Sequence, residues 1–239
     1  MSVVLTFERA LSRLATSPVC LVVDDRLGAP LLPDRGEELA ALATVAPIRL
    51  DDFRRGRACA RAAMMKLGHH AEPVLRDDRG PRWPTRIVGS ITHCSGLAAA
   101  AVAWRNAVSG IGIDSEPRGR VPRNLAPRIC TPLELATAIS ACSSDDGLTL
   151  LWCVKEAVFK CVNPISGQFL EFLDITIALD PINSTFTALA TSKSAKSIVA
   201  PVHGAFAFNK THTMAGCVAL NRVDDARSGS ERLRHERTN

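Results

Sequence analysis

The chain has 239 residues, of which 46% are hydrophobic and 22% are charged. Its length allows one large domain or two small ones, and its composition is that of a soluble globular protein rather than a disordered one. No apolar run approaches the roughly 20 residues that a membrane span needs. Charged residues interrupt residues 1–23, which do not resemble a signal peptide. We therefore expect a cytoplasmic protein without a membrane span.

The net charge of +5 comes from one part of the chain. Residues 49–86 hold ten of the 29 lysines and arginines but only five of the 24 acids, so the remainder has 19 of each. A cationic excess gathered in one segment favours an anionic partner there. A nucleic acid, a phosphorylated small molecule and an acidic protein all meet that description.

The first half of the chain reads as a helix followed by strands. An apolar stripe predicts a helix over residues 50–67, which ends at Gly68, and a basic, turn-rich loop follows at 76–84. Short apolar runs separated by turns then predict three strands. These strands are expected at 86–93, 97–104 and 108–114.

The second half repeats this order. A helix is expected over 131–142, with Thr131 as N-cap, and another over 148–162, which Pro164 is expected to stop. Strands are then expected at 172–179, 186–190, 204–208 and 214–220.

A helix followed by an antiparallel meander, twice over, indicates an α+β protein of two pseudo-symmetric lobes, each a helix packed on a small antiparallel sheet. We assign residues 1–113 to the N-terminal lobe and 114–222 to the C-terminal lobe. Residues 223–239 are polar and lack periodicity, and we expect a disordered tail there.

One expected strand carries two carboxylates on one face. In residues 110–116 the isoleucines alternate with glycines and acids, so Asp114 and Glu116 point to the same side. The glycines on that side predict open space in front of the carboxylates. Two carboxylates about 7 Å apart suit Mg²⁺, which completes its shell with water and phosphate.

The expected helix at 148–162 is apolar nearly all round, as in a buried helix, yet it carries charges. Lys155 and Glu156 share a stripe with two aromatic residues, and Lys160 lies at its edge. Buried charges must be paired or bound to something. An ordinary ion pair between Glu156 and Lys160, four residues apart, would explain part of the pattern, but Lys155 has no such local partner.

Three motifs together resemble those of the 4′-phosphopantetheinyl transferases of the larger, monomeric class. They are Gly89–His93, the strand at 110–116 and the stretch 152–157 with Lys160. The sequences at 83–84 and 57–61 resemble most the branch of enterobactin synthetase component D and actinobacterial enzymes. The resemblance in motifs covers about residues 49–162. It implies transfer of the phosphopantetheine arm of coenzyme A to a serine of an acyl or peptidyl carrier protein, which releases adenosine 3′,5′-bisphosphate.

The resemblance also implies a role for each site residue. Mg²⁺, or Mn²⁺ in its place, would be held by Asp114, Glu116 and Glu156, with Glu156 also acting as general base. The pyrophosphate would be bound by His93 and Lys160, with Lys155 in the same pocket. The 3′-phosphate of the nucleotide would be bound by Arg49 and Arg57, with Arg76 and Arg79 as further candidates. A metal contact from Ser115 stays open, and Arg54, Arg55 and Arg61 are expected on a solvated face.

Two other functions compete with this one. A nucleic-acid-binding protein would explain the basic segment, but not Lys155 and Glu156 or the acidic pair, and few aromatic residues are present for stacking on bases. A Mg²⁺-dependent phosphoester hydrolase could use the same acidic site with water as the nucleophile. The sequence does not identify the carrier protein or its pathway.

Overall fold

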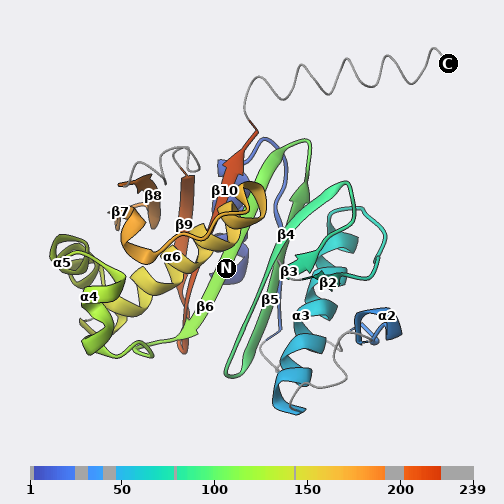
Figure 1. The fold of residues 1–239 in the computed structure, drawn as a ribbon, viewed down its shortest axis with the longest axis horizontal. Coiled ribbons are helices and arrows are strands. Elements are labelled where there is room, and N and C mark those ends of the chain that lie inside the picture. The colour runs from blue at the N-terminus through green and yellow to red at the C-terminus, as the bar shows by residue number, and fades with distance from the viewer. Residues whose placement is uncertain are drawn as a thin grey trace.

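The computed structural model describes residues 3–24, 32–39, 47–77, 80–142, 144–191 and 202–221. The chain forms two lobes (Figure 1). In the first lobe, helix α3 packs on an antiparallel sheet of order β1-β5-β4; in the second, helix α6 packs on an antiparallel sheet of order β6-β10-β9-β8-β7. The α+β architecture of two helix-on-sheet lobes is confirmed. No helix in the described ranges is long and apolar enough to cross a membrane.

The first lobe is built mainly from the N-terminal half of the chain. Its elements are α1 (Val3–Leu14), β1 (Cys20–Asp24), α2 (Gly36–Leu39), α3 (Pro47–Lys66), β2 (Leu75–Asp77), β3 (Gly80–Arg82), β4 (Ile87–Cys94) and β5 (Leu97–Trp104). Strands β2 and β3 form a separate hairpin, at the position of the expected basic loop.

The second lobe begins at β6. Its elements are β6 (Val108–Pro117), a 3₁₀ turn (Arg123–Leu125), α4 (Ala126–Ile129), α5 (Pro132–Ala141), α6 (Ser144–Ser166), a second 3₁₀ turn (Phe172–Asp174), β7 (Ile175–Asp180), β8 (Thr185–Ala190), β9 (Val202–Phe208) and β10 (His212–Leu220). Every expected strand in both halves is present, although the first turn of the 172–179 segment is a 3₁₀ helix.

The two lobes share part of their core. Phe7 and Leu11 of α1, which sequence reasoning did not identify as a helix, pack in one buried cluster with Met214 and Val218 of β10. The N-terminal helix therefore lies against the sheet of the second lobe. The boundary expected between residues 113 and 114 falls inside β6, and the division into 1–113 and 114–222 stays a prediction. The tail at 223–239 lies outside the described residues.

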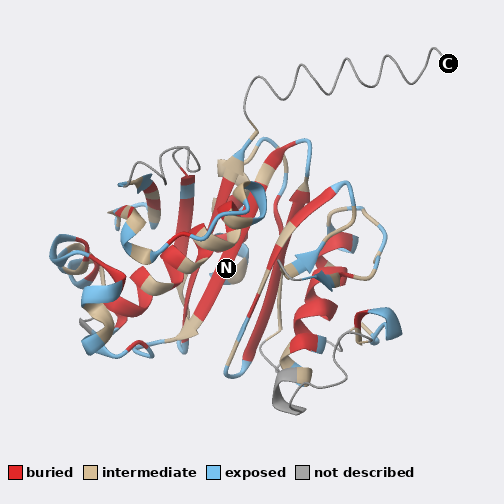
Figure 2. Ribbon diagram, viewed as in Figure 1, coloured by how far each residue is buried: buried red, intermediate tan, exposed pale blue. Residues whose placement is uncertain are grey.

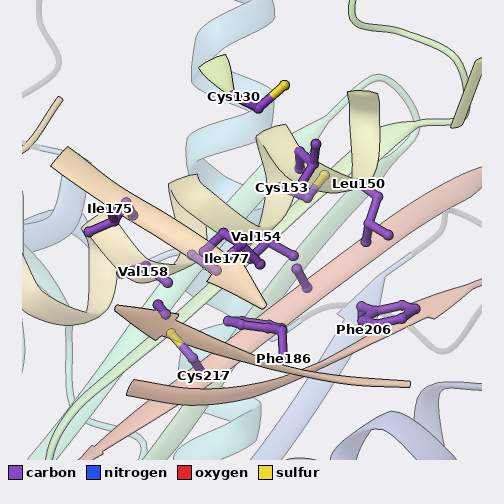
Figure 3. Packing of buried hydrophobic residues seen from close by; sticks show 14 of the residues in the cluster. Cys130, Leu150, Cys153, Val154, Val158, Ile175, Ile177, Phe186, Phe206 and Cys217 are labelled. Carbon is purple, nitrogen blue, oxygen red and sulfur yellow. The ribbon is translucent and has the colours of Figure 1, made fainter. Parts of the chain in front are cut away.

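Helix α6 is the axis of the second lobe. Its inward face, with Leu150, Val154 and Val158, packs on Phe186 and its neighbours in the sheet (Figure 3), and its middle turns are buried (Figure 2). The expected stop at Pro164 is wrong, because α6 continues to Ser166. Near a C-terminus, proline removes only one helical N–H bond. The helix ends at Gly167, whose φ of 66° and N–H bond to the Asn163 carbonyl oxygen form a C-terminal cap.

Candidate active site

The glycines of β6 allow helix α6 to approach the strand closely. A Cβ atom on Gly112 would lie 1.9 Å from the Ala157 carbonyl oxygen, and one on Gly110 would lie 2.5 Å from the Cys161 carbonyl oxygen. The backbone of α6 therefore fills the space in front of these glycines, and the expectation of open space there is wrong. What the glycines provide is close approach, which carries Lys160 up to Asp114 on the same face of the strand.

Asp114 joins three elements. Its Oδ1 atom lies 2.6 Å from the Lys160 ammonium of α6 and accepts a hydrogen bond of 2.9 Å from the Thr92 hydroxyl of β4. Its Oδ2 atom is buried and has no hydrogen-bond partner among the described residues. The sequence also allowed an ion pair between Glu156 and Lys160 within α6. The described contacts instead show the Lys160 ammonium paired with Asp114 of β6.

Two glutamates near Asp114 have raised pKa values. Burial raises the pKa of Glu116, and the charges of Asp114 and Glu156 raise it further against the opposing effects of Arg120 and Lys160. Burial also raises the pKa of Glu156, where Asp114 adds to the shift and Lys160 opposes it. Burial is thus the main cause of both raised pKa values, and the nearby cations oppose it.

Carboxylates are suitable ligands for a hard divalent cation, but Asp114, Glu116 and Glu156 do not surround a common point in this structure. Among the described residues, no three His, Cys, Asp or Glu side chains form a ready-made metal cluster. Mg²⁺ commonly takes only one or two carboxylates and completes its shell with water and phosphate. The unpartnered Oδ2 of Asp114 is such a donor, so the ligand set of Asp114, Glu116 and Glu156 stays a prediction.

Ser115 points away from the carboxylates. It is buried, and its hydroxyl donates to the Thr213 carbonyl oxygen of β10 at 3.0 Å. In a strand, neighbouring side chains face opposite sides, and this one has a backbone partner. The structure thus gives the Ser115 side chain no place among the metal donors.

His93 lies near the end of β4, next to Thr92, and its side chain faces Asp52 of α3. Its Nδ1 atom is 3.9 Å from Asp52 Oδ2, and half of the side chain is exposed. Burial lowers its pKa; Asp52 opposes this shift, while Lys160 and Arg57 add to it. The imidazole is therefore neutral at neutral pH and offers one N–H donor.

Arg57 is a buried cation held by backbone carbonyl groups. Its Nε atom donates to the Val74 carbonyl oxygen at 2.8 Å, and its guanidinium lies 4.1 Å from the ring centre of Phe53. Burial lowers its pKa to about 10; Glu38 opposes the shift, and the charges of Arg76 and Arg61 add to it. No carboxylate in the described part of the chain forms an ion pair with Arg57, so an anion placed beside Arg57 and Arg76 would relieve their repulsion.

Of Arg54, Arg55 and Arg61, which were all expected on a solvated face, only Arg54 is exposed. Arg55 and Arg61 are buried and bound to Asp24 and Glu38, so their placement on a solvated face is wrong. Arg54 does lie exposed. Four of the ten cations at 49–86, Arg54, Arg55, Arg61 and Lys66, form internal ion pairs within the described part of the chain, which reduces the charge available for a nucleic acid. The side chain of Arg49 and the whole of Arg79 lie outside the described residues.

Lys155 is turned away from Lys160. Its ammonium lies 3.0 Å from Glu134 of α5 and also donates to two backbone carbonyl oxygens. Burial lowers its pKa, and Glu134 opposes that shift. The expectation that Lys155 shares a pocket with Lys160 is therefore wrong. Sequence reasoning missed Glu134: Thr131 and Glu134 form a capping box that the pattern at 131–134 could have shown, but their spacing does not reveal a partner on α6.

Two cavities flank Phe159 of α6. The Glu156 cavity, of about 330 Å³, is lined by Arg128, Lys155, Glu156, Phe159, Phe169, Leu170, Glu171, Phe172 and Ile175. It is mostly apolar and has Glu156 in its wall. The second, of about 600 Å³, lies between the lobes and has Trp83, Ser90 and Lys160 in its wall.

Two family models match successive parts of the chain. The family model described as the 4′-phosphopantetheinyl transferase N-terminal domain matches residues 37–103. The model of the 4′-phosphopantetheinyl transferase superfamily matches residues 110–214. The two matches follow one another along the chain and together contain β4, α6 and most of β6.

Curated relatives match a large part of the chain. The chain is 40% identical over 156 residues to the 4′-phosphopantetheinyl transferase Svp of Streptomyces mobaraensis, which is 64% of this chain and 63% of that protein. It is 35% identical over 169 residues to PptT of Mycobacterium tuberculosis, 69% of this chain and 73% of that protein. It is 37% identical over 115 residues to enterobactin synthase component D of Escherichia coli, 47% of this chain and 54% of that protein. The chain belongs to the two-domain class of the 4′-phosphopantetheinyl transferase superfamily.

Proposed function

We propose that this chain transfers the 4′-phosphopantetheine group from coenzyme A to a serine hydroxyl of an apo acyl or peptidyl carrier protein and releases adenosine 3′,5′-bisphosphate. The observation that carries this proposal is the contact of Lys160 with Asp114 beside Glu156, where one buried carboxylate oxygen still lacks a partner. Since both lobes of one chain supply the site, we expect a monomer to be active.

The parts of coenzyme A match three regions of the molecule. Arg57 and Arg76 are the cations that would bind the 3′-phosphate, and Arg49 and Arg79 remain further candidates for this contact. The pyrophosphate fits between His93 and Lys160. The pantetheine arm, an aliphatic chain with amide groups, fits the largely apolar Glu156 cavity.

The chemistry requires positioning and charge neutralisation more than a covalent intermediate. Mg²⁺, or Mn²⁺ in its place, bound through Asp114, Glu116 and Glu156 would neutralise pyrophosphate charge. Glu156 accepts the proton of the serine hydroxyl, directly or through a water molecule, and its raised pKa suits a base. Lys160 offsets the charge that develops on the leaving phosphate.

The test is the mass of the carrier. Purified chain, coenzyme A and Mg²⁺ should make an apo carrier heavier by one phosphopantetheine, and a carrier whose acceptor serine is replaced by alanine should stay unchanged. A panel of fatty-acid, polyketide and nonribosomal-peptide carriers identifies the preferred partner. No mass gain on any of them would refute the proposal, and equal breakdown of coenzyme A with and without carrier would indicate a hydrolase instead.

A further inference from the structure

Lys155 has no N–H group left for a substrate. Its Nζ atom lies 3.0 Å from Glu134 Oε1 and donates to the carbonyl oxygens of Phe172 and Ile175 at 2.9 Å each. A lysine ammonium carries three N–H donors, so these three acceptors use all of them. Only 1% of the residue is exposed. A direct contact with a phosphate would first require this network to break.

The partner carboxylate is equally occupied. Glu134 Oε1 also accepts from the Ile177 backbone N–H at 2.9 Å, and Oε2 accepts from the Thr131 backbone N–H at 2.8 Å. One carboxylate therefore connects the start of α5, the strand β7 and, through Lys155, the middle of α6. A fully bonded buried pair of this kind fixes the elements that it joins.

The anchored segment is one wall of the Glu156 cavity. Phe172 and Ile175, whose carbonyl groups Lys155 holds, both line this cavity together with Glu156. Lys155 and Glu156 are neighbours on the same turn of α6. The network therefore determines how far the wall at 172–175 stands from Glu156, and hence the width of the cavity.

We propose that Lys155 is a positioning residue, which together with Glu134 holds the 172–175 wall of the Glu156 cavity in place and so determines the affinity for the arm that enters this cavity. This inference rests on the proposed function, in which the arm is the pantetheine chain of coenzyme A. Lys155 then acts on the arm through the wall, whereas Lys160 acts on the phosphates directly.

Two ligands separate these roles. Coenzyme A has the arm and the phosphates, whereas adenosine 3′,5′-bisphosphate has the nucleotide phosphates without the arm. Titration calorimetry with Mg²⁺ should show that Lys155→Met weakens coenzyme A binding about tenfold, as expected for a wall that loses its hydrogen bonds. Binding of the bisphosphate should change less than about twofold, because its phosphates do not reach this wall. Lys160→Met, the matched variant, should weaken both ligands.

Lys155→Met leaves the Glu134 charge buried and unpaired, which can prevent folding. The double variant Lys155→Met/Glu134→Gln removes that charge, and it should show the same selective loss of coenzyme A affinity. Circular dichroism verifies the fold of each variant before titration.

Each remaining outcome has a definite meaning. Equal weakening of both ligands by the folded double variant would show that Lys155 contacts phosphate, and unchanged affinity for both would show that the network does not set the cavity; either result overturns the inference. The proposed function fails separately, when the unaltered chain binds no coenzyme A or modifies no carrier.

Discussion

Helix α6 carries two lysines five residues apart, and each meets a carboxylate from another element. At Lys155 and Glu134 the pair is closed: every donor and acceptor has a partner, and both side chains are buried. At Lys160 and Asp114 the pair is open: the lysine side chain is 29% exposed and one carboxylate oxygen is unpartnered.

The difference separates two uses of the same chemistry. In the closed pair, additional hydrogen bonds offset the cost of taking charges out of water, so the pair joins elements and has no capacity for a ligand. Beside the open pair, burial raises the pKa of Glu116 and Glu156, and neither carboxylate forms an ion pair within the described residues. An open ion pair beside a cavity therefore marks the site that binds a ligand, and a closed one marks its support.

The largest expected effect is on catalysis, at Glu156. Glu156→Gln should lower kcat for carrier modification about 10²- to 10⁴-fold, because the proposed general base is lost. The fold should not suffer, since Glu156 has no hydrogen bond or ion pair within the described residues, and its charge is disfavoured by burial. Mass spectrometry of the carrier over time gives kcat, and thermal unfolding gives Tm. A large fall in Tm would mean that Glu156 belongs to the supporting network instead.

The next largest effect is on stability, at the closed pair. Lys155→Met should reduce the free energy of unfolding by about 3–5 kcal/mol, the cost of leaving one partner of a buried pair uncompensated. Lys160→Met should reduce it less, because Lys160 is partly exposed and Asp114 keeps the Thr92 hydrogen bond. Urea unfolding of both variants makes the comparison. Equal losses would erase the distinction between closed and open pairs.

An added methyl group at Gly112 tests the contact between β6 and α6. Gly112→Ala should cost about 1–3 kcal/mol of stability, since its Cβ would overlap the Ala157 carbonyl oxygen. Moving α6 away from β6 also separates Lys160 from Asp114, so carrier modification should fall as well. Gly36→Ala is the matched control, because no atom lies within 4 Å of its added Cβ. Normal activity in a stable Gly112→Ala variant would contradict the proposed role of the glycine.

The sequence predicted the strands and the motifs but not the distribution of partners. Alternation at residues 110–116 predicted that Asp114 and Glu116 share a face, and apolar content predicted that α6 is buried. Both follow from local periodicity. Which lysine meets which carboxylate depends on how α5, β4 and β6 pack around α6, and one sequence does not contain that information. The same limit explains why Arg55 and Arg61, which have acidic partners far along the chain, were placed on the surface.

A smaller effect concerns pH and Mg²⁺. The pKa values of Glu116 and Glu156 are raised in the folded state. The two groups therefore stabilise the folded state fully below the ordinary pKa of a glutamate. This contribution is lost as the pH rises through their pKa values in the folded state. Glu134 behaves oppositely: burial raises its pKa, but the Thr131 and Ile177 amides and Lys155 bring it below normal, so its contribution is lost as pH falls.

Mg²⁺ at neutral pH should therefore raise Tm by binding the folded state. Glu116→Gln should raise Tm in the absence of Mg²⁺ and reduce the increase that Mg²⁺ produces. Differential scanning fluorimetry at several pH values, with and without Mg²⁺, measures both changes. The same Mg²⁺ response in the variant and the original chain would show that Glu116 is not a ligand of the proposed metal site.

The smallest effect is expected where an ion pair is neither closed nor beside a cavity. Arg54 and Asp34 lie 3.0 Å apart, but their side chains are 44% and 40% exposed. Water and salt screen such a pair, so Arg54→Ala should change the free energy of unfolding by less than about 1 kcal/mol. Arg61 lies in the same helix and pairs with the buried Glu38. Arg61→Ala should reduce the free energy of unfolding several times more, because Glu38 would stay buried without its cation. Urea unfolding of both variants ranks them, and a loss at Arg54 as large as at Arg61 would show that burial does not decide which pairs support this fold.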